Sequence, residues 1–343
     1  MKLSENQRDR YSRLLALRNI HEEDMESIMN TTVAVVGAGG LGSPALTLLT
    51  AIGFGKIRII DRDIVELSNI QRQTVYNTVD IGYPKAEAAA ANLGLKNPEV
   101  ELEPYSISLE EENALDLLHG ADIIVDGLDS FETRKIVNRT SLRLGIPYIF
   151  AGAVEYFANL STFIPGKTAC FNCIMGDAVD NPLNTCANIG VSPTLLAITA
   201  SIEVNEALFL ATGREPLLAN RLMTIDSDTL SFETFDISQS KTCVVCSNQR
   251  EILEEKKEGL YVKKLCSMSF NITPPKLENI DLGKISLRLS KSYPVTQAGR
   301  FIIINVSSEE KITLMSSGSA IVKGVKTADD AVRLYQLIRE IKD

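Results

Sequence analysis

The sequence lacks a surplus of positive charge: 35 Lys and Arg residues stand against 44 Asp and Glu, a formal net charge of −9. A chain with this balance has no broad attraction to nucleic acid or to anionic membranes, so we expect neither as a partner. The N-terminal stretch MKLSENQRDR has no apolar signal core, which favours a cytoplasmic protein.

The sequence also lacks a long apolar run that is free of charge. The longest run, at about 191–212, is interrupted by Glu203, Asn205 and Glu206, which predicts a buried helix and not a membrane span. Only two histidines are present, and neither has metal-like neighbours. With 343 residues, 45% hydrophobic and 23% charged, the chain is long enough to bury a large core.

The first positive signal is an alternation of short apolar strands and helical stretches. Strands are predicted at 32–36, 56–60, 100–105, 122–125 and 148–150, and helices at 84–97, 110–119 and 131–144. A helical segment at about 5–29 precedes them. This order predicts the α/β class: a Rossmann-like, doubly wound, mainly parallel sheet that binds its ligand at the carboxyl ends of its strands.

The pattern changes after residue 150. We expect a strand at 160–164, an apolar helix from Ser192 and a hairpin from 222–225 and 231–235. The charge run QREILEEKKE indicates a linker at 248–258, between a domain at 1–247 and a module at 259–343; a solvated helix end is a compatible alternative. Strands at 301–305, 311–315 and 320–323 and a helix at 327–341, capped by Thr327, predict a small α+β module.

A glycine-rich motif follows the first strand. The strand TVAVV runs into a G-x-G-x-x-G pattern whose glycines are Gly37, Gly39, Gly40 and Gly42, and a helix follows. Small residues bring backbone N–H groups close to a phosphate at a helix N-terminus. Asp61 comes 19 residues after Gly42, where an acid can accept from a ribose hydroxyl. Taken alone, this motif could form the binding site for NAD or FAD, or a glycine-rich turn that binds no ligand.

The loop IDRDIVELSNIQRQ argues against a dehydrogenase, because a nicotinamide does not explain its polar groups. Its residues Asp63, Asn69, Arg72 and Gln73 would lie at the ligand-facing end of the second strand. Arg72 offers a planar fork for phosphate oxygens. Lys85 adds a cation at a helix start, and Asp129 follows the fourth strand, where it can hold Mg²⁺ between phosphates.

These motifs together resemble the MoeB/ThiF/HesA family of ubiquitin-activating-enzyme-like adenylyltransferases. The resemblance runs from QRDRYSR through GAGGLGS, IDRDIVELSNIQRQ, GYPKAEAA and GLDSFETR to the second CxxC pair. It implies an enzyme that binds Mg-ATP and a small ubiquitin-like or sulfur-carrier protein ending in Gly-Gly. The terminal carboxylate would attack the α-phosphate, giving an acyl-adenylate and pyrophosphate.

The resemblance also implies roles for single residues. Asp61 would hold the ribose, Asn69, Arg72, Gln73 and Lys85 the phosphates, and Asp129 the metal. Arg13 would reach the triphosphate of a partner subunit, so that a homodimer forms the site. These roles are consistent with the chemistry of adenylation, because the attacking carboxylate is already a nucleophile. Catalysis then needs alignment and cationic stabilisation of phosphoryl charge, and no base.

Four of the six cysteines form two CxxC pairs. The pairs Cys170–Cys173 and Cys243–Cys246 are separated by 69 residues. Four thiolates in this arrangement are typical of a structural, tetrahedral Zn²⁺ site without a vacant position. A redox CxxC or buried thiols are the alternatives.

The remaining cysteines are treated separately. Cys186 lies in the polar loop 181–190, where a thiol outside both pairs is a candidate nucleophile or sulfur carrier. In some family members the corresponding cysteine takes the activated chain as a thioester or persulfide-linked adduct, and in others it is dispensable. Cys266, beside Leu265, is interpreted as a small buried residue.

The C-terminal module carries no recognisable activity of its own. It has no sulfurtransferase-type loop, and because the sequence does not end in Gly-Gly we do not expect a fused ubiquitin-like substrate. We expect the module to dock the substrate protein or to extend the dimer.

Other functions remain as alternatives. They are a same-fold enzyme that adenylates a small molecule, a peptide or tRNA, an inactive regulatory relative, and a nicotinamide oxidoreductase. For the leading function, the sequence favours none of the molybdopterin, thiamine, tRNA-thiolation or protein-conjugation pathways.

Overall fold

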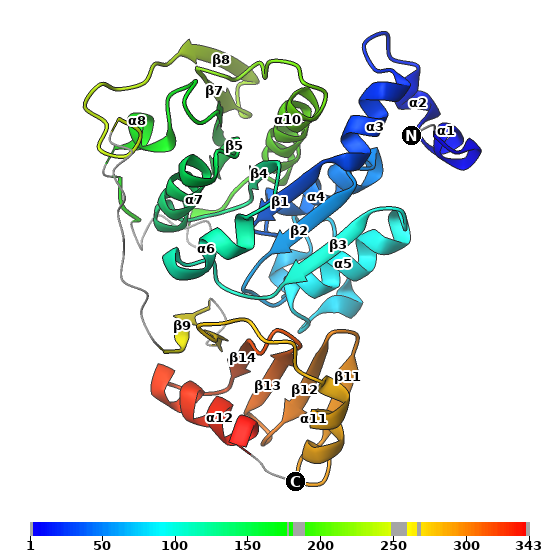
Figure 1. Ribbon diagram of the computed structural model, residues 1–343. Helices are drawn as coiled ribbons and strands as arrows, with labels where there is room; N and C mark the ends of the chain where they lie inside the picture. Colours follow the sequence, from blue (N-terminus) through cyan, green and yellow to red (C-terminus); the bar gives the residue numbers. More distant parts are fainter. Residues whose placement is uncertain (1–2, 177, 181–188, 248–258, 266–268, 341–343) are drawn as a thin grey trace.

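The computed structural model describes residues 3–176, 178–180, 189–247, 259–265 and 269–340. They form an eight-stranded sheet flanked by helices and, below it in Figure 1, a six-stranded sheet with two helices. The predicted linker at 248–258 lies outside the described residues.

The large sheet has the strand order β3-β2-β1-β4-β5-β6-β7-β8. Its first five strands are parallel: β1 (Thr32–Val36), β2 (Lys56–Ile60), β3 (Glu101–Tyr105), β4 (Ile123–Asp126) and β5 (Tyr148–Val154). The last three continue it antiparallel: β6 (Phe157–Phe163), β7 (Arg221–Asp226) and β8 (Ser231–Asp236). The predicted Rossmann-like, mainly parallel sheet is confirmed.

Helices bury both faces of the parallel strands. One face carries α3 (Glu22–Asn30), α4 (Gly42–Ile52), α5 (Lys85–Lys96) and α10 (Pro193–Ala211), and the other α6 (Glu111–Leu118), α7 (Phe131–Leu144) and α8 (Phe171–Met175). Along β1, Val33 and Val35 enter the first core, whereas Ala34 and Val36 enter the second. Burial on both faces explains why these strands are continuous apolar runs in the sequence.

The remaining helical segments of the large domain are short. The predicted helical segment at 5–29 is divided into α1 (Glu5–Arg10), α2 (Ser12–Leu15) and α3, and the loop after β2 contains the 3-10 turns η1 (Leu67–Asn69) and η2 (Thr78–Asp80).

Helix α10 is the apolar helix expected from the sequence. By length and composition alone it is long and apolar enough to cross a membrane. Here it packs between α4 and the strands β5 and β6, and Glu203 and Glu206 are buried with its apolar side chains. The Glu206 carboxylate accepts hydrogen bonds from the Thr162 hydroxyl at 2.7 Å and from two backbone N–H groups. The interpretation as a buried helix is therefore confirmed.

The small sheet is antiparallel, with the order β11-β12-β13-β14-β10-β9. Its elements are β9 (Tyr261–Lys264), β10 (Ser269–Thr273), α11 (Leu282–Leu289), β11 (Val295–Ala298), β12 (Phe301–Asn305), β13 (Lys311–Met315), β14 (Ala320–Lys323) and α12 (Ala328–Glu340). Of these, β12, β13, β14 and α12 were predicted. The Thr327 hydroxyl caps α12 by accepting from the Asp330 N–H at 3.1 Å.

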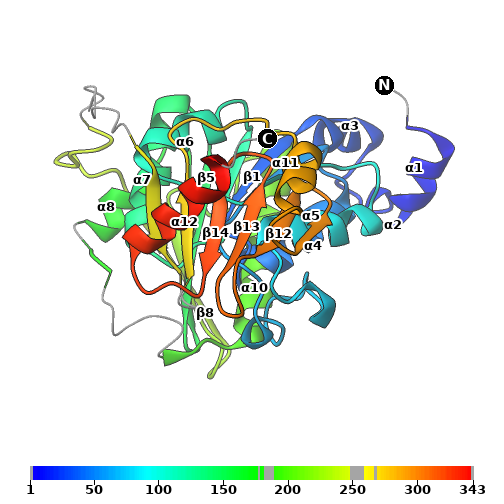
Figure 2. The ribbon, with the colours of Figure 1, turned by 90° about the horizontal axis from the view of Figure 1, so that it is seen from below.

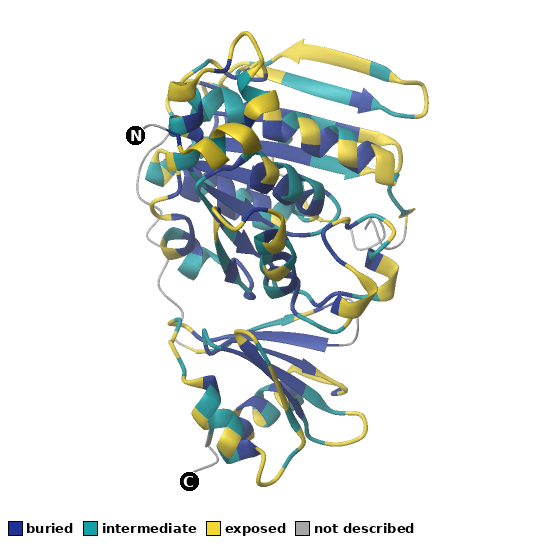
Figure 3. Cartoon of the chain, turned by 90° about the vertical axis from the view of Figure 1, so that its right-hand side faces the viewer, coloured by how far each residue is buried: buried dark blue, intermediate teal, exposed yellow. Residues whose placement is uncertain are grey.

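The two faces of the small sheet have different neighbours. Both helices cover the outer face, as Figure 2 shows from below. The inner face packs against the large domain, where Ile64 and Tyr83 meet Phe301, Ile303 and neighbouring side chains. The rings of Tyr83 and Phe301 lie edge to face with centroids 5.1 Å apart. The small sheet is therefore a buried layer between its helices and the large domain (Figure 3).

Glu87 on α5 gives the first prediction, which concerns stability and pH. Burial raises the pKa of Glu87 to about 7, with Arg300 opposing the shift. The folded chain thus holds this proton more tightly than the unfolded chain, and the resulting stabilisation is lost as pH rises through about 7. We expect Glu87→Gln to stabilise the protein at pH 8 by on the order of 1–2 kcal/mol in urea unfolding, and little at pH 5.

The exposed Glu215→Gln variant is the matched control for this measurement. An equal stability difference for Glu87→Gln at both pH values would contradict the assignment.

Candidate functional site

The glycine-rich turn between β1 and α4 is shaped by three backbones in contact. Gly37 has φ +96°, and a Cβ there would lie 2.3 Å from the Gly127 carbonyl oxygen. A Cβ on Gly42 would lie 1.8 Å from the Gly37 carbonyl oxygen. At Gly39, by contrast, the nearest atoms would be 3.9 Å away. The turn therefore excludes side chains where it meets the loop after β4, and leaves open space at Gly39.

Asp61, the first residue after β2, ties this turn to the following loop. Its carboxylate accepts from the N–H groups of Ala38 and Asp63, each at 2.7 Å. Burial raises the pKa of Asp61, and the Lys85 ammonium opposes this rise. Each carboxylate oxygen keeps a further lone pair. The contact with a ribose stays a prediction.

Lys85 at the start of α5 has the anionic neighbour that its position requires. Its Nζ lies 3.1 Å from Asp63 Oδ2. Burial by itself would lower the pKa of Lys85, but the carboxylates of Asp63 and Asp61 outweigh it and the net pKa is raised. The buried lysine is therefore charged.

The polar loop presents its remaining groups around η1. Asn69 accepts from the Glu66 N–H at 3.0 Å, and Arg72 donates to the Ser68 carbonyl at 2.8 Å. Gln73 is buried, and its Oε1 has no hydrogen-bond partner in the described part of the chain. A buried amide oxygen without a partner at a cavity wall is what a bound polar ligand would satisfy.

A buried ion pair that sequence reasoning missed holds the loop after β4. Arg134 Nε lies 3.0 Å from Asp126 Oδ2, and the Tyr148 hydroxyl donates to the same carboxylate. Arg134 also donates to the carbonyls of Leu128 at 2.5 Å and Ala151 at 2.8 Å. The loop that carries Asp129 is thereby fixed. The signal was present in the motif GLDSFETR, whose arginine falls on the first turns of α7.

These residues enclose one cavity of about 910 Å³, within the size range of small-molecule sites. Ten of the predicted ligand residues line it: Gly37, Gly39, Gly40, Asp61, Asp63, Asn69, Arg72, Gln73, Lys85 and Asp129. Gly42 does not line it, because it packs beneath the turn.

Other predicted residues lie elsewhere. Asp129 was expected at the end of the fourth strand, but β4 ends at Asp126 and Asp129 is exposed in the loop beyond. Arg13 is exposed on α2 and does not line the cavity. Cys186 and Cys266 lie outside the described residues.

The two CxxC pairs meet in one cluster. The sulfur atoms of Cys170 and Cys173 are 3.8 Å apart, those of Cys170 and Cys243 3.7 Å, and those of Cys173 and Cys246 3.4 Å. Four sulfurs bound tetrahedrally at about 2.3 Å would be separated by about 3.8 Å. The cluster therefore fits zinc, and its four thiolates leave no open position. It lies apart from the cavity, which none of these cysteines lines.

Comparison with known proteins agrees with the fold. The model of the ThiF family matches residues 11–246. A sulfur carrier protein adenylyltransferase of Thermus thermophilus is 34% identical over 74% of this chain and 97% of its own length. A sulfur carrier protein ThiS adenylyltransferase of Bacillus subtilis is 29% identical over 95% of this chain and 98% of its own.

A solved structure of E. coli MccB with ATP superposes with a TM-score of 0.62. It is 26% identical and covers 70% of this chain and 75% of its own. The fold is that of a Rossmann-like enzyme, and the chain belongs to the ThiF family. Within that family its enzyme class is adenylyltransferase.

The glycine contacts generate a paired prediction. Gly42→Ala would force a Cβ against the Gly37 carbonyl, so we expect loss of soluble folded protein or a marked fall in melting temperature. Gly39→Ala meets no atom within 3.9 Å and should fold like the wild type. Circular dichroism melting of the two variants tests this. Equal melting temperatures would show that the turn tolerates a side chain at Gly42.

The cysteine cluster generates a prediction about metal. We expect one zinc per chain, and Cys173→Ser to lose both the metal and several kcal/mol of stability, because metal binding in such sites is coupled to folding. Metal content by mass spectrometry and thermal melting measure the two effects. Cys266→Ser, outside the CxxC pairs, is the control. A metal-free protein with unchanged melting would reject the structural role.

Proposed function

We propose that this enzyme activates a small ubiquitin-like or sulfur-carrier protein with ATP. The carboxylate of the carrier's C-terminal Gly-Gly would attack the α-phosphate of ATP, forming an acyl-adenylate and releasing pyrophosphate. The observation that carries this proposal is one cavity that combines the glycine turn, the buried Lys85, Arg72 and the exposed carboxylate of Asp129. The names of the Thermus and Bacillus relatives support a sulfur-carrier substrate.

The residues of the cavity suit this chemistry because adenylyl transfer to a carboxylate, with pyrophosphate as the leaving group, needs no general base. Backbone N–H groups of the turn and the charges of Lys85 and Arg72 stabilise negative charge on the phosphates. Asp61 and Asp63 hold Lys85 charged. Asp129 is exposed, makes no hydrogen bond in the described part of the chain and would hold Mg²⁺, which neutralises phosphate charge when bound.

The rim of the cavity favours a protein substrate. Val154 and Phe157 line the cavity and are also exposed. Phe157 on β6 pairs with Asp226 on β7, which in turn pairs with Ser231 on β8. The residues on either side of Ser231, Leu230 and Phe232, are also apolar and exposed. An exposed apolar surface beside a nucleotide cavity suits docking of a folded carrier. The likeness to MccB is the ground for the second candidate, adenylation of a peptide or other small substrate.

The proposal includes a homodimer in the cytoplasm, with no nucleic acid or membrane as partner. Arg13 is exposed on α2 and outside its own cavity, which supports a role for it in the cavity of a second subunit.

Cys186 has two possible roles within this function. It would take the activated carrier as a thioester or a persulfide-linked adduct in sulfur transfer, or the adenylate is handed on directly. Ile189, three residues later, lines the cavity. Neither role is needed for adenylation itself, because a thiol supplies no phosphate charge or alignment.

Pyrophosphate exchange with ATP tests the proposal. We expect exchange only when a Gly-Gly-ended carrier is present, and a loss of about a hundredfold or more in Asp129→Ala, because the removed charge acts mainly in the transition state. Cys186→Ala is the matched control and should exchange at the wild-type rate. Exchange that runs equally well with free amino acids or short peptides would favour the second candidate.

A subunit-mixing experiment tests the dimer. Arg13→Ala and Asp129→Ala homodimers should each be inactive. Mixing them under subunit exchange should restore about one working site per heterodimer, since one site collects both lesions and the other none. Absence of recovery despite verified exchange of subunits would show that Arg13 does not act across the interface.

A further inference from the structure

The small sheet holds two backbone carbonyls of the large domain through buried side chains. The Asn271 amide nitrogen on β10 donates to the carbonyl of Arg62 at 3.2 Å and to that of Ser106 at 3.5 Å. The Ser319 hydroxyl donates to the Ser106 carbonyl at 3.2 Å. Asn271 and Ser319 are fully buried. Buried hydrogen bonds of this kind fix backbone positions, because leaving either partner unpaired costs the desolvation of a polar group.

Both carbonyls belong to segments that form the cavity wall. Arg62 separates Asp61, which binds the glycine turn, from Asp63, which pairs with Lys85. Ser106 directly precedes residues 107–109, all of which line the cavity. A shift of either carbonyl would therefore move the wall at the position that meets the nucleotide.

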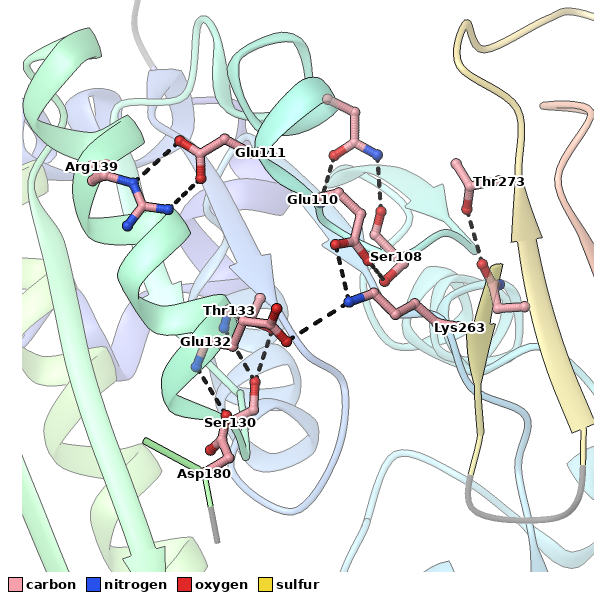
Figure 4. Close-up of polar contacts among 12 residues, drawn as sticks. Ser108, Glu110, Glu111, Ser130, Glu132, Thr133, Arg139, Asp180, Lys263 and Thr273 are labelled. Carbon is pink, nitrogen blue, oxygen red and sulfur yellow. Dashed lines mark hydrogen bonds and ion pairs between the residues drawn. The ribbon is translucent and has the colours of Figure 1, made fainter. Parts of the chain in front are cut away.

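A second side chain sets the direction of the Asn271 amide. The Thr273 hydroxyl, also fully buried, donates to Asn271 Oδ1 at 2.9 Å. The oxygen of the amide is thereby engaged on the side of Thr273, and the amide nitrogen is directed toward the two carbonyls. In Figure 4 Thr273 is labelled on the small sheet, with a dashed line marking the hydrogen bond of its hydroxyl group.

Other contacts between the module and the cavity rim are weaker or apolar. Lys263 on β9 bridges Glu110 at 3.3 Å and Glu132 at 3.7 Å, but these groups are partly exposed, and such pairs contribute little (Figure 4). Leu265, the residue after β9, is buried and lines the cavity itself. The module thus touches the cavity directly and also supports its wall.

We propose that the C-terminal module completes the nucleotide site. Asn271 is a positioning residue: oriented by Thr273, it holds the loops after β2 and β3 so that Asp61 and Asp63 meet ATP in the correct place. This inference rests on the proposed function of the cavity as an ATP site.

Thr273 offers a mild test in the full chain. Thr273→Val keeps the shape of the side chain and removes the hydroxyl that orients Asn271. We expect the Kd for ATP by calorimetry, and the KM for ATP in pyrophosphate exchange, to rise about tenfold, as for other residues that support a binding group, with a much smaller change in kcat. Thr273→Ser, which keeps the hydroxyl, should restore wild-type affinity.

The matched control is Thr296→Val, an exposed threonine on β11 of the same sheet, which should leave both constants unchanged. A folded Thr273→Val protein that binds ATP like the wild type overturns the inference. A wild-type protein that binds no ATP overturns the proposed function instead.

If Thr273→Val fails to fold, amide hydrogen exchange of the wild-type protein with and without ATP tests the inference instead. ATP should slow amide exchange in 269–273 and 319–323 as well as in the glycine turn. Protection of the turn with no change in these two segments would overturn the inference.

Discussion

The contact of three glycine backbones is the constraint on which the site depends. Gly37, Gly42 and Gly127 approach so closely that a Cβ on any of them would lie within 2.3 Å of a carbonyl oxygen. The ends of β1 and β4 and the start of α4 can converge only because these positions carry no side chain. Asp61 then fixes the turn by accepting from Ala38 N–H, which couples it to the charged loop after β2. The close packing of these backbones therefore sets the shape of the cavity and the position of the charged loop after β2.

The cysteine cluster supports the same site from a distance. Cys170 begins α8, and the next residue, Phe171, donates its N–H to Asn138 Oδ1 on α7 at 3.1 Å. Helix α7 carries Arg134, which holds the loop with Asp129. A metal that fixes α8 would thus stabilise α7 and, through Arg134, the position of the free carboxylate, without contacting the cavity.

Much of this arrangement could be predicted from the sequence, and the exceptions have physical causes. Strands buried on both faces, such as β1, appear as apolar runs, and the glycine and loop motifs located the cavity. Strand β10 was missed because Ser269, Asn271 and Thr273, on one of its faces, are polar and yet fully buried against the large domain. Polar residues at alternate positions of a strand normally indicate a face exposed to solvent. Arg134 was missed because only the folded chain brings its partners together, namely the buried Asp126 carboxylate and the carbonyls of Leu128 and Ala151.

The apolar contact between the small sheet and Ile64 and Tyr83 of the large domain has a consequence for the family. The Thermus relative matches 74% of this chain with 97% of its own length, which leaves no room for a module of this size. Without the module, Ile64 and the ring of Tyr83 would face water beside the loop that follows β2. We therefore expect relatives with and without the module to differ in the residues at these two positions.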